Sequence, residues 1–579
     1  MSTNENNPTR KDFPAEGTEI SGSEALILTL MKEGVDTIFG YPGGAIMPVY
    51  DALFDYRDRL NHILVRHEQG AAHAAESYAK ILGKPGVVMV TSGPGATNLI
   101  TGLANAMIDS VPMVAFSGQV ASGLLGTDAF QETDVMGITM PVTKWNYQIT
   151  RAEEIPEVVA KAFYLASTGR PGPVMVDITK DAQFGKMKWH YEKCRKIRSY
   201  FPYPKVRQDK VEEAAHLINK SKKPLLIAGR GISISNAHEE LMQLVTKADI
   251  PVTTTLLGIS SFPADHPLNV GMPGMHGNMA PNIKTNECDL LIAIGMRFDD
   301  RITGRLDDYA KQAKIIHIEI DHSEISKNVP TDVAIVADAK DALNKLLPLV
   351  KENDHKEWIE SFRKEYEKEY DKVIKPAREG NGSDIKMDEV VHMISEKTDG
   401  QAIVVTDVGQ HQMVVARNYR FKQSRSFVTS GGLGTMGFGL PAAVGAKVAR
   451  PDRLVLGFTG DGGFQMTIQE LGTIAQHKLP VKIILLNNSF LGMVRQWQDM
   501  FFDKRYSFTE LANPAFTKIA SEGYGIDSLY VEKREDLEGA VEKMLATDGP
   551  FLLEVKVMKE QNVFPMVPAG ASVSDMVTE

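Results

Sequence analysis

The sequence contains an aspartate between two glycines and, further along the chain, a pair of asparagines, and these side chains could bind a metal ion. Gly460-Asp461-Gly462 comes first, and Asn487-Asn488 follows after residues 463–486. An apolar run precedes each, Leu454–Thr459 and Val481–Leu486. Two parallel strands would bring a carboxylate and an amide oxygen to one sheet edge, where ligands of open α/β sheets bind. Hard oxygen ligands beside a diphosphate suit Mg²⁺.

Taken alone, the first pattern is a tight turn and the second a helix cap. The strand expected before each half favours a metal–diphosphate site instead. The segment Thr467–His477 is expected to form a helix, whose N-terminus favours an anion. The two patterns and their spacing match the motif of thiamine diphosphate enzymes, GDG followed by NN.

A thiamine cofactor needs a second element, a carboxyl group at its pyrimidine ring. The ring must be shifted to its imino tautomer, which requires a carboxyl hydrogen-bonded to N1′ in a dry site. Glu68 is the candidate, because it follows the apolar run His62–Val65 and precedes a helix expected at Ala71–Lys80. From spacing alone, a carboxylate at a helix N-terminus is the favoured interpretation.

Parallel sheets must position these residues, and the chain has enough apolar runs to build several. Short runs expected to be buried strands alternate with longer helical patterns, which is typical of βαβ units. The runs are Gly86–Thr91, Val111–Ser117, Pro224–Ala228, Leu290–Gly295, Ile315–Ile320, Ala402–Thr406, Leu454–Thr459 and Val481–Asn487. We predict an α/β protein with several parallel-sheet domains, with a single barrel as the alternative on pattern alone.

Two linker-like stretches divide the chain into three segments of similar size. Residues 186–210 mix aromatic and basic residues with prolines. Lys351–Lys375 is highly charged and is expected to be a solvated helix ending near Pro376, with a surface face and no binding patch, before a loop at Glu379–Asp384. The predicted organisation is a flexible tail at 1–17, domains at 18–185, 211–350 and 386–579, and linkers at 186–210 and 351–385.

Bulk composition excludes several classes of protein. The 579 residues carry a net charge of −10, which argues against nucleic acid as the main partner. Cys194 and Cys288 are far apart and in no CxxC pair, so neither a disulfide framework nor a zinc site is expected. No apolar run is long enough to span a membrane, and the first residues lack a signal-peptide core. We therefore expect a cytoplasmic protein.

Longer motifs extend the match along nearly the whole chain, from about Ile20 to Pro565. They are Phe39–Pro48 (FGYPGGAIMP), Arg66–Gly70 (RHEQG), Thr91–Asn98 (TSGPGATN), Gly126–Thr133 (GTDAFQET), Gly169–Asp177 (GRPGPVMVD), Arg297–Arg301 (RFDDR), Ser430–Pro441 (SGGLGTMGFGLP) and Met493–Gln498 (MVRQWQ). In this order they resemble the large catalytic subunits of the acetohydroxyacid synthase (acetolactate synthase) family. The resemblance implies three doubly wound parallel-sheet domains, which bind the pyrimidine, an FAD and the diphosphate.

The resemblance also implies an activity. Pyruvate is decarboxylated and condensed with pyruvate or 2-ketobutyrate, giving 2-acetolactate or 2-aceto-2-hydroxybutyrate for branched-chain amino acid synthesis. The implied cofactors are thiamine diphosphate, Mg²⁺ and a redox-idle FAD. The active site is implied to lie between the first domain of one subunit and the third domain of another, so a homodimer or homotetramer is expected. The family usually has a small regulatory subunit.

Position by position, the resemblance assigns roles to residues. It makes Glu68 the proton-relay carboxylate, which reverses the interpretation from spacing, and it makes Asp461, Asn488 and the Phe490 backbone oxygen the metal ligands. Met436 is implied to bend the cofactor. The other implied catalytic positions are Gly44, Gln131 and Trp497, and the other thiamine diphosphate contacts are Tyr41, Gly43, Pro94, Asn98, Gly409, Gln410, His411, Gly434, Gly460, Gly462, Gly463, Leu491, Gly492 and Met493.

The implied FAD contacts cluster in the middle of the chain. From the residues alone, Ile227–Gly231 (IAGRG) is a strand followed by a glycine turn, which is weak evidence for a nucleotide. The RFDDR motif favours the flavin-containing biosynthetic branch of the family over the flavin-free catabolic one. The matching positions are Arg170, Gly229, Gly231, Met275, His276, Gly295, Arg297, Asp299, Arg301, Glu319, Asp338 and Ala339.

Three positions bear on specificity. Trp497 stands where the biosynthetic enzymes prefer 2-ketobutyrate; its indole could contact one extra methyl, worth roughly 1 kcal/mol, and a structural tryptophan is the alternative. Ala121 replaces the family's usual proline, so weakened inhibition by sulfonylureas is expected. Arg230 replaces a smaller residue beside the flavin. Two other functions stay open here, a flavin oxidoreductase of pyruvate oxidase type and a nucleotide-binding regulatory module without turnover.

Overall fold

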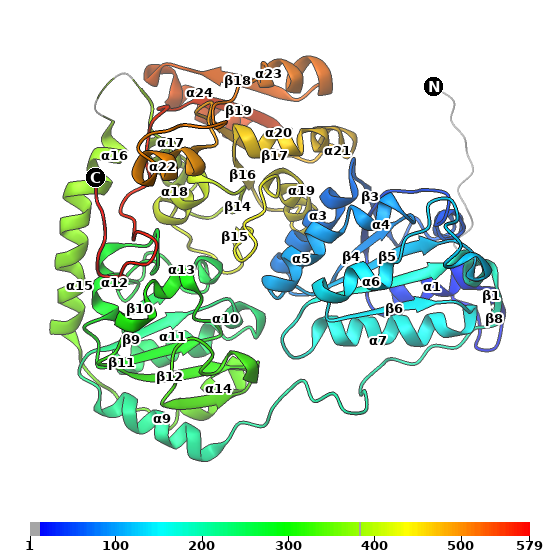
Figure 1. The fold of residues 1–579 in the computed structure, drawn as a ribbon, viewed down its shortest axis with the longest axis horizontal. Helices are drawn as coiled ribbons and strands as arrows, with labels where there is room; N and C mark the ends of the chain where they lie inside the picture. Colours follow the sequence, from blue (N-terminus) through cyan, green and yellow to red (C-terminus); the bar gives the residue numbers. More distant parts are fainter. Residues whose placement is uncertain (1–11, 381, 383) are drawn as a thin grey trace. The chain divides into compact units, whose positions relative to one another are not determined.

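The computed structural model describes residues 12–380, 382 and 384–579 (Figure 1). Most of the predicted tail 1–17 and part of the expected loop Glu379–Asp384 lie outside the described residues. The chain forms two compact units. The N-terminal unit comprises the described residues up to Tyr200 with Gly432–Ala449 and Thr467–Leu479, and the C-terminal unit comprises Phe201–Gly431, Arg450–Met466 and Pro480–Glu579. The predicted domain boundaries stay predictions.

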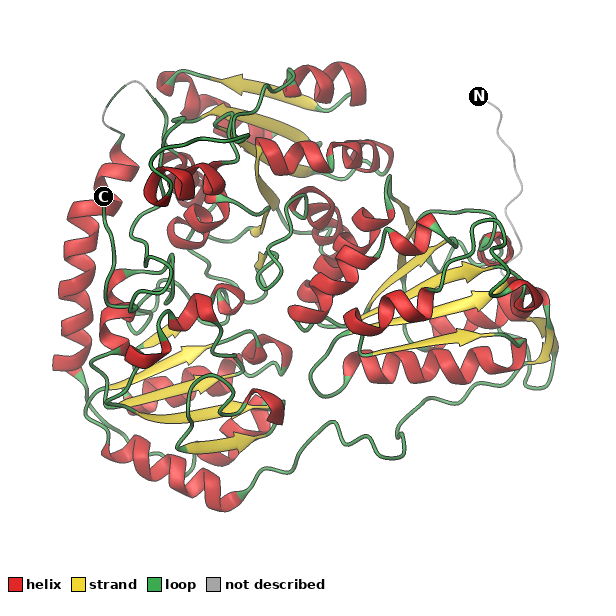
Figure 2. Ribbon diagram, in the orientation of Figure 1, coloured by secondary structure: helices red, strands yellow, loops and turns green. Residues whose placement is uncertain are grey.

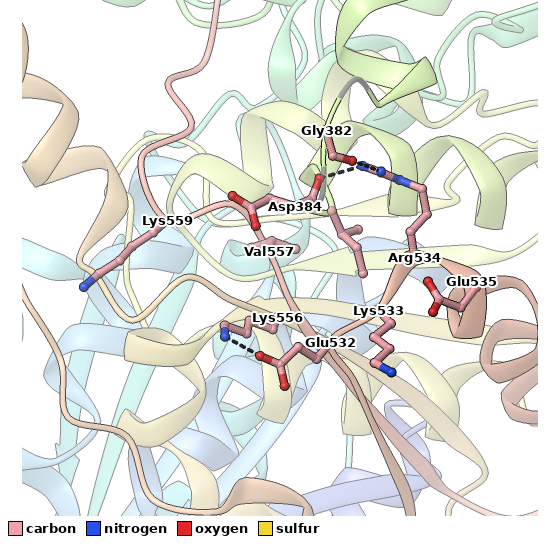
Figure 3. A pocket seen from close by; sticks show the side chains of 10 residues that line it. Gly382, Asp384, Glu532, Lys533, Arg534, Glu535, Lys556, Val557 and Lys559 are labelled. Atoms are coloured by element: carbon pink, nitrogen blue, oxygen red, sulfur yellow. Dashed lines mark hydrogen bonds and ion pairs between the residues drawn. The ribbon is translucent and has the colours of Figure 1, made fainter.

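A six-stranded parallel sheet forms the centre of the N-terminal unit. Its strands, in spatial order, are β3 (Asn61–Leu64), β2 (Thr37–Gly40), β4 (Gly86–Val90), β5 (Met113–Gln119), β7 (Pro173–Thr179) and β6 (Trp145–Ile149). The inner strands β4, β5 and β7 are buried along their whole length, which is why they appear in the sequence as continuous apolar runs. Helices lie on both sides of this sheet (Figure 2), among them α1 (Gly22–Lys32), α3 (Glu68–Leu82), α5 (Ile100–Ile108) and α7 (Ile155–Ser167).

The helix α3 is rich in alanine and begins with Glu68, Gln69 and Gly70, so other segments approach it closely. α19 (Gly439–Ala449) packs against it, and a Cβ added to Gly445 would lie 1.9 Å from the Ala74 carbonyl oxygen. At the start of α3, a Cβ on Gly70 would lie 2.5 Å from a carboxylate oxygen of Glu470. The same carboxylate accepts a hydrogen bond from the Arg66 amide at 3.1 Å. Gly70 and the backbone amide of Arg66, both in the RHEQG motif, therefore contribute to the contact with Glu470.

The C-terminal unit contains two parallel sheets. The strands of the first, in spatial order, are β10 (Val252–Thr254), β9 (Pro224–Ala228), β11 (Leu290–Ile294), β12 (Lys314–Glu319) and β13 (Val333–Val336). Those of the second are β15 (Phe427–Val428), β14 (Ile403–Thr406), β16 (Val455–Gly460), β17 (Val481–Asn487), β19 (Phe551–Lys556) and β18 (Asp527–Val531). Helices in this unit include α9 (Gln208–Lys220), α11 (His238–Ala248), α14 (Ala339–Leu346), α17 (Met387–Lys397), α18 (Gln410–Asn418), α22 (Gly492–Phe501) and α24 (Arg534–Ala546).

The α/β fold class is confirmed. Every expected run forms a strand, β4, β5, β9, β11, β12, β14, β16 and β17, with ends within two residues of those expected. The alternative of a single barrel is wrong, because the three parallel sheets are open and have edge strands. A small antiparallel pair, β1 (Glu19–Ser21) with β8 (Lys186–Lys188), was not expected and places a strand at the start of the predicted linker 186–210.

The helix expected at Thr467–His477 is confirmed as η8 (Ile468–Glu470) and α21 (Leu471–Gln476), which follow one another without a gap. A further short helix, α20 (Asp461–Met466), begins at Asp461 itself and was not expected. The expectation for Lys351–Lys375 needs correction. The charged segment forms α15 (Lys356–Glu369), but helical structure continues past Pro376 in α16 (Lys375–Glu379). It is not wholly solvated either, because Glu369 is buried and its carboxylate pairs with Arg417 at 2.6 Å.

Cys194 and Cys288 are both unpaired, as expected from their positions. In the described part of the chain, no helix combines the length and the apolar character that crossing a membrane requires.

Candidate active site

The register of two neighbouring strands places Asp461 and the asparagine pair together. In the pairing of β16 with β17, Gly460 lies opposite Leu486, so the residues that follow each strand leave the sheet side by side. Asp461 and Asn488 are both buried, with exposed fractions of 1% and 5%. Burial raises the pKa of Asp461 to about 6, against several hydrogen bonds that lower it. A buried carboxylate of this kind needs a cation or strong donors to stay ionised.

Asn513 supports the aspartate, although no sequence motif marks this residue. Its Nδ2 donates to Asp461 Oδ2 at 2.6 Å and lies 3.1 Å from Asn487 Oδ1. Its own Oδ1 is buried and has no hydrogen-bond partner among the described residues. Asn513 therefore orients one carboxylate oxygen and leaves an oxygen available beside it.

The oxygen donors at this edge fit a magnesium ion. The described residues contain no group of three or more His, Cys, Asp or Glu side chains that could hold a metal. A metal here would instead use one carboxylate, one amide oxygen and backbone oxygens, which are the hard donors that Mg²⁺ takes. Phe490, whose carbonyl is the third predicted ligand, follows Ser489 with φ 58° and donates its amide to Asn488 Oδ1 at 3.2 Å.

A second strand end, that of β14, adds the predicted diphosphate turn. Gly409 precedes α18, whose first residues are Gln410 and His411. Gln410 Oε1 accepts from Asn488 Nδ2 at 3.3 Å, so this turn contacts the asparagine of the proposed metal site directly. A Cβ on Gly492 would lie only 2.1 Å from the same Gln410 oxygen, which explains the glycine at the start of α22 beside Leu491 and Met493.

His411 lines the approach to this edge. Burial lowers the pKa of His411 to about 4, so the ring is neutral, and its Nε2 has no hydrogen-bond partner in the portion the structure describes. A Cβ on Gly409 or on Gly460 would lie 3.0 Å from the His411 ring. The unpaired ring nitrogen and the two bare backbone positions suit a bound diphosphate.

Asp407 also belongs to this edge and was missed from the sequence. It follows β14 as Asp461 follows β16, and it is fully buried. A Cβ on Gly463 would lie 2.2 Å from Asp407 Oδ1, so the glycine lets α20 approach this carboxylate. The rule that functional residues follow parallel strands would have found it.

Glu68 lies in the N-terminal unit as the first residue of α3. Asn98 Nδ2 donates to Glu68 Oε2 at 2.9 Å, which holds the carboxylate toward the turn that begins with Pro94. Glu68 is half-buried, so within one chain it is drier than a surface residue but not enclosed. The two predicted pyrimidine-side residues, Pro94 and Asn98, are therefore brought to the predicted proton-relay carboxylate.

Two further loops meet the same turn. Gly93 has φ 56°, and a Cβ there would lie 2.8 Å from the carbonyl of Gln131, which has φ 60° itself. A Cβ on Gly43 would lie 2.5 Å from the Thr91 side chain. The structure thus gathers the loops of Tyr41–Gly44, Thr91–Asn98 and Gln131 at the carboxyl ends of β2, β4 and β5.

Met436 and Trp497 fall in different units. Met436 is half-buried between Gly434 (φ 67°) and Gly437 (φ 83°) in a segment that belongs to the N-terminal unit. Trp497 lies on α22 in the C-terminal unit, and its ring is 5.0 Å from that of Phe501.

Most of the predicted FAD residues follow the carboxyl ends of β9, β11, β12 and β13. Gly229 and Gly231 follow β9, and a Cβ on either would lie within 2.4 Å of backbone atoms of Gly295. Asp299 and Asp338 each accept amide hydrogen bonds at the start of a helix, and burial raises the pKa of both carboxyls.

The predicted FAD set also includes a histidine with a buried ring nitrogen. His276 Nδ1 is buried and has no hydrogen-bond partner among the residues described, and burial lowers the pKa of His276 to about 4. Met275 and Arg301 contact each other through a backbone hydrogen bond of 2.8 Å. The rest of the set lies nearby along the same strand ends: Arg297, Glu319 and Ala339. Arg170 is in the N-terminal unit, where its Nε donates to Ser110 at 2.9 Å.

The two residues that depart from the family pattern, Ala121 and Arg230, each lie directly before a short helix. Ala121 has φ −60° just before η1 (Ser122–Leu124), a backbone angle that proline also adopts. Arg230 precedes α10 (Gly231–Ile234) with φ −63°.

Comparison with known proteins matches three stretches of the chain to three domains of one enzyme family. Residues 20–138 match the N-terminal TPP binding domain of thiamine pyrophosphate enzymes, residues 211–346 the central domain, and residues 407–555 the C-terminal TPP binding domain. The chain is 45% identical over 558 residues to the acetolactate synthase large subunit of Lactococcus lactis, with 96% of each covered. It is 45% identical over 566 residues to the acetolactate synthase isozyme 2 large subunit of Escherichia coli, covering 96% of this chain and 99% of the relative. A Corynebacterium glutamicum acetolactate synthase large subunit is 45% identical over 571 residues, with 96% and 90% covered.

Proposed function

Because the chain belongs to the acetolactate synthase large-subunit family of thiamine pyrophosphate enzymes, we propose that it joins two 2-keto acids with loss of CO₂. Pyruvate is the first substrate, and pyruvate or 2-ketobutyrate is the second. The products are 2-acetolactate and 2-aceto-2-hydroxybutyrate, at the first common step of branched-chain amino acid synthesis. The observation that carries the proposal is the pairing of β16 with β17, which brings Asp461 and Asn488 to one point.

At that point, Asp461, Asn488 and the Phe490 carbonyl would hold Mg²⁺ against the diphosphate. Asn513 fixes the aspartate, and Gln410 fixes the asparagine. His411, which is neutral and has a buried ring nitrogen, would face the diphosphate. Outer partners of this kind hold metal ligands in place.

Glu68 is the residue we assign to proton movement. Asn98 holds its carboxylate, so that it can exchange a proton with the pyrimidine ring at N1′. When bound, thiamine diphosphate supplies the electron sink that decarboxylation and carbon–carbon bond formation require. Gly44 and Gln131 lie on loops at the carboxyl ends of strands of the N-terminal sheet, the sheet that also carries Glu68, and they would face the reacting carbon. Met436 would support the cofactor, and Trp497 would contact the second 2-keto acid.

FAD is a further cofactor of the proposal. The close approach of Gly229, Gly231 and Gly295, together with the buried nitrogen of His276, supports a nucleotide lying across the strand ends of the middle sheet. It would be retained as a structural group, since the condensation needs no external oxidant.

The proposed assembly is at least a homodimer, with each active site shared between the first domain of one subunit and the third domain of its partner. A homotetramer and a small regulatory subunit are compatible with the "large subunit" in the names of the relatives. The two unpaired cysteines support a reducing compartment, the cytoplasm.

The test is product formation from pyruvate with and without thiamine diphosphate, Mg²⁺ and FAD, in the absence of an electron acceptor and then with oxygen. We expect acetolactate and CO₂ without oxygen uptake, dependent on thiamine diphosphate and Mg²⁺. Acetate or acetyl phosphate with oxygen uptake would indicate an oxidase of pyruvate oxidase type. No turnover with all cofactors present would indicate a regulatory module and refute the proposal.

A further inference from the structure

A chain of buried polar side chains on α3 and α5 has no part in the function proposed above. It consists of Glu76 and Lys80 on α3, Asn105 on α5 and Asp109 directly after α5. Their exposed fractions are 0%, 7%, 0% and 3%. Buried charges persist only where they are paired and hydrogen-bonded. The partners of these residues therefore show what the group holds in place.

One end of the chain is attached to the segment Gly432–Phe438. The Gly432 amide donates to Asp109 Oδ1 at 2.8 Å. The other carboxylate oxygen, Asp109 Oδ2, accepts from Lys80 Nζ at 2.9 Å. Lys80 Nζ lies 2.6 Å from Glu76 Oε1, so one ammonium joins two buried carboxylates.

The other end returns to the same segment. Glu76 Oε2 accepts from Asn105 Nδ2 at 2.7 Å, and Asn105 Oδ1 accepts from Thr435 Oγ1 at 3.2 Å. The contacts therefore close into a ring, which leaves the segment at Gly432 and re-enters it at Thr435. We call Lys80, Glu76, Asn105 and Asp109 the buried ring.

Phe438 attaches the far end of the segment to the same helix. Its ring centroid is 5.3 Å from Lys80 Nζ, and the His73 ring meets it edge-on at 5.1 Å. Burial alone would raise the pKa of Glu76, but Lys80 and His73 offset this and lower it to about 2. The Glu76 carboxylate is therefore ionised at neutral pH, and the ion pair with Lys80 is intact.

The segment so attached contains neither helix nor strand, and it carries Met436. Gly434 and Gly437, on either side of Met436, have φ 67° and φ 83°, so no regular backbone structure fixes the methionine. Its position depends instead on the attachments of the segment, which include those at Gly432, Thr435 and Phe438 and a hydrogen bond from Thr467 Oγ1 to the Gly437 carbonyl at 3.0 Å. Resting on the proposed function, we infer that the buried ring is a positioning device, which fixes the Gly432–Phe438 segment and so sets where Met436 meets the cofactor.

The test uses Thr435→Val, which removes one attachment and keeps the shape of the side chain. Thr29→Val is the matched control, because Thr29 is a buried threonine of the same unit whose hydroxyl donates to Ala25 within α1. We expect Thr435→Val to lower kcat about tenfold and to raise the Kd for thiamine diphosphate, since small misplacements at an active site are costly. The urea midpoint should match that of Thr29→Val.

A double-mutant cycle shows whether the effect passes through Met436. In a Met436→Ala background, Thr435→Val should no longer change kcat, because the group that it positions is gone. Equal effects in both backgrounds would overturn the inference. So would a Thr435→Val enzyme with the kcat and cofactor Kd of the Thr29→Val control.

A readout without turnover separates this inference from the proposed function. Asp109→Asn weakens the acceptor of the Gly432 amide, so hydrogen exchange in residues 432–438 of the full chain should be faster than in the unsubstituted protein. Unchanged exchange in both Asp109→Asn and Thr435→Val would overturn the positioning role. Absence of acetolactate formation by the unsubstituted protein would refute the proposed function and leave the exchange result to be interpreted on its own.

Discussion

At the scale of single residues, Asn513 holds one of the proposed metal ligands, Asp461. Its amide donates to the Asp461 carboxylate and also contacts Asn487. We expect Asn513→Ala to raise the apparent Kd for Mg²⁺ by about 10–100-fold, because lost outer-shell partners have effects of this size. Asn219→Ala is the control, since Asn219 also makes two hydrogen bonds with its side chain but lies in the middle domain. Equal Mg²⁺ affinities in the two variants, measured by activation of the apoenzyme, would contradict the role.

Glu68 is the single residue to which we assign proton transfer. Its carboxylate is held by one bond from Asn98, and glutamine keeps that acceptor but cannot exchange the proton. We expect Glu68→Gln to lower kcat by at least about a hundredfold, the usual scale of general acid–base catalysis, with a nearly unchanged Kd for thiamine diphosphate. Glu153→Gln, at an exposed position of the same unit, should retain full activity. A Glu68→Gln enzyme with normal turnover would refute the assignment.

At the scale of elements, the crossing of α3 and α19 depends on a glycine. A Cβ on Gly445 would meet the Ala74 backbone at 1.9 Å, and backbone cannot move aside as a flexible side chain can. We expect Gly445→Ala to destabilise the protein by about 1–3 kcal/mol, as overpacking does. Gly539→Ala in the middle of α24 has open space around it and should stabilise by about 0.5–1 kcal/mol. Opposite shifts of the two urea midpoints are the expected result, and a neutral Gly445→Ala would contradict the packing argument.

A buried aspartate on β7, Asp177, is expected to make the stability of the protein depend on pH. Asp177 is fully buried, and burial raises its pKa to about 6, although Ser117, Gln148 and Gln119 donate to it. A carboxyl whose pKa is raised on folding adds stability below its unfolded pKa and loses it as the pH rises through the folded pKa. Between about pH 4 and pH 7, the unsubstituted protein should therefore lose up to about 3 kcal/mol relative to Asp177→Asn.

The measurement for Asp177 is the urea midpoint of both proteins at pH 4.5 and pH 7.5, values that bracket the raised pKa. Asp58→Asn, at an exposed position, is the control and should follow the unsubstituted protein at both pH values. Parallel pH profiles for Asp177→Asn and the unsubstituted protein would show that Asp177 does not titrate in this range.

At the scale of the whole molecule, the proposed sharing of active sites between subunits can be tested by mixing. Chains with Glu68→Gln and chains with Asp461→Asn should each be inactive alone. After joint unfolding and refolding, half of the dimers would be mixed and would have one intact site of two, so about a quarter of full activity should return. If each site were built within a single chain, the mixture would stay inactive. The control is each variant refolded alone.

Local sequence patterns were enough to predict the strand ends to which we assign the chemistry. Asp461, Asn488, Glu68 and the glycine turns were placed from local patterns, because apolar runs and turn residues act over a few neighbours. The family motifs added roles to those positions. The short helix α20 was not predicted, since its start depends on the tight turn at the strand end and not on helical periodicity.

The distant side chains that support those positions become visible only in the folded chain. Asn513 reaches Asp461 from 52 residues away, and Thr435 reaches Asn105 from 330 residues away. No local pattern marks such a partner, because an asparagine or threonine reads as a turn or surface residue until packing buries it. Burial then leaves each polar group in need of a partner, and the fold supplies that partner from whichever segment lies closest in space.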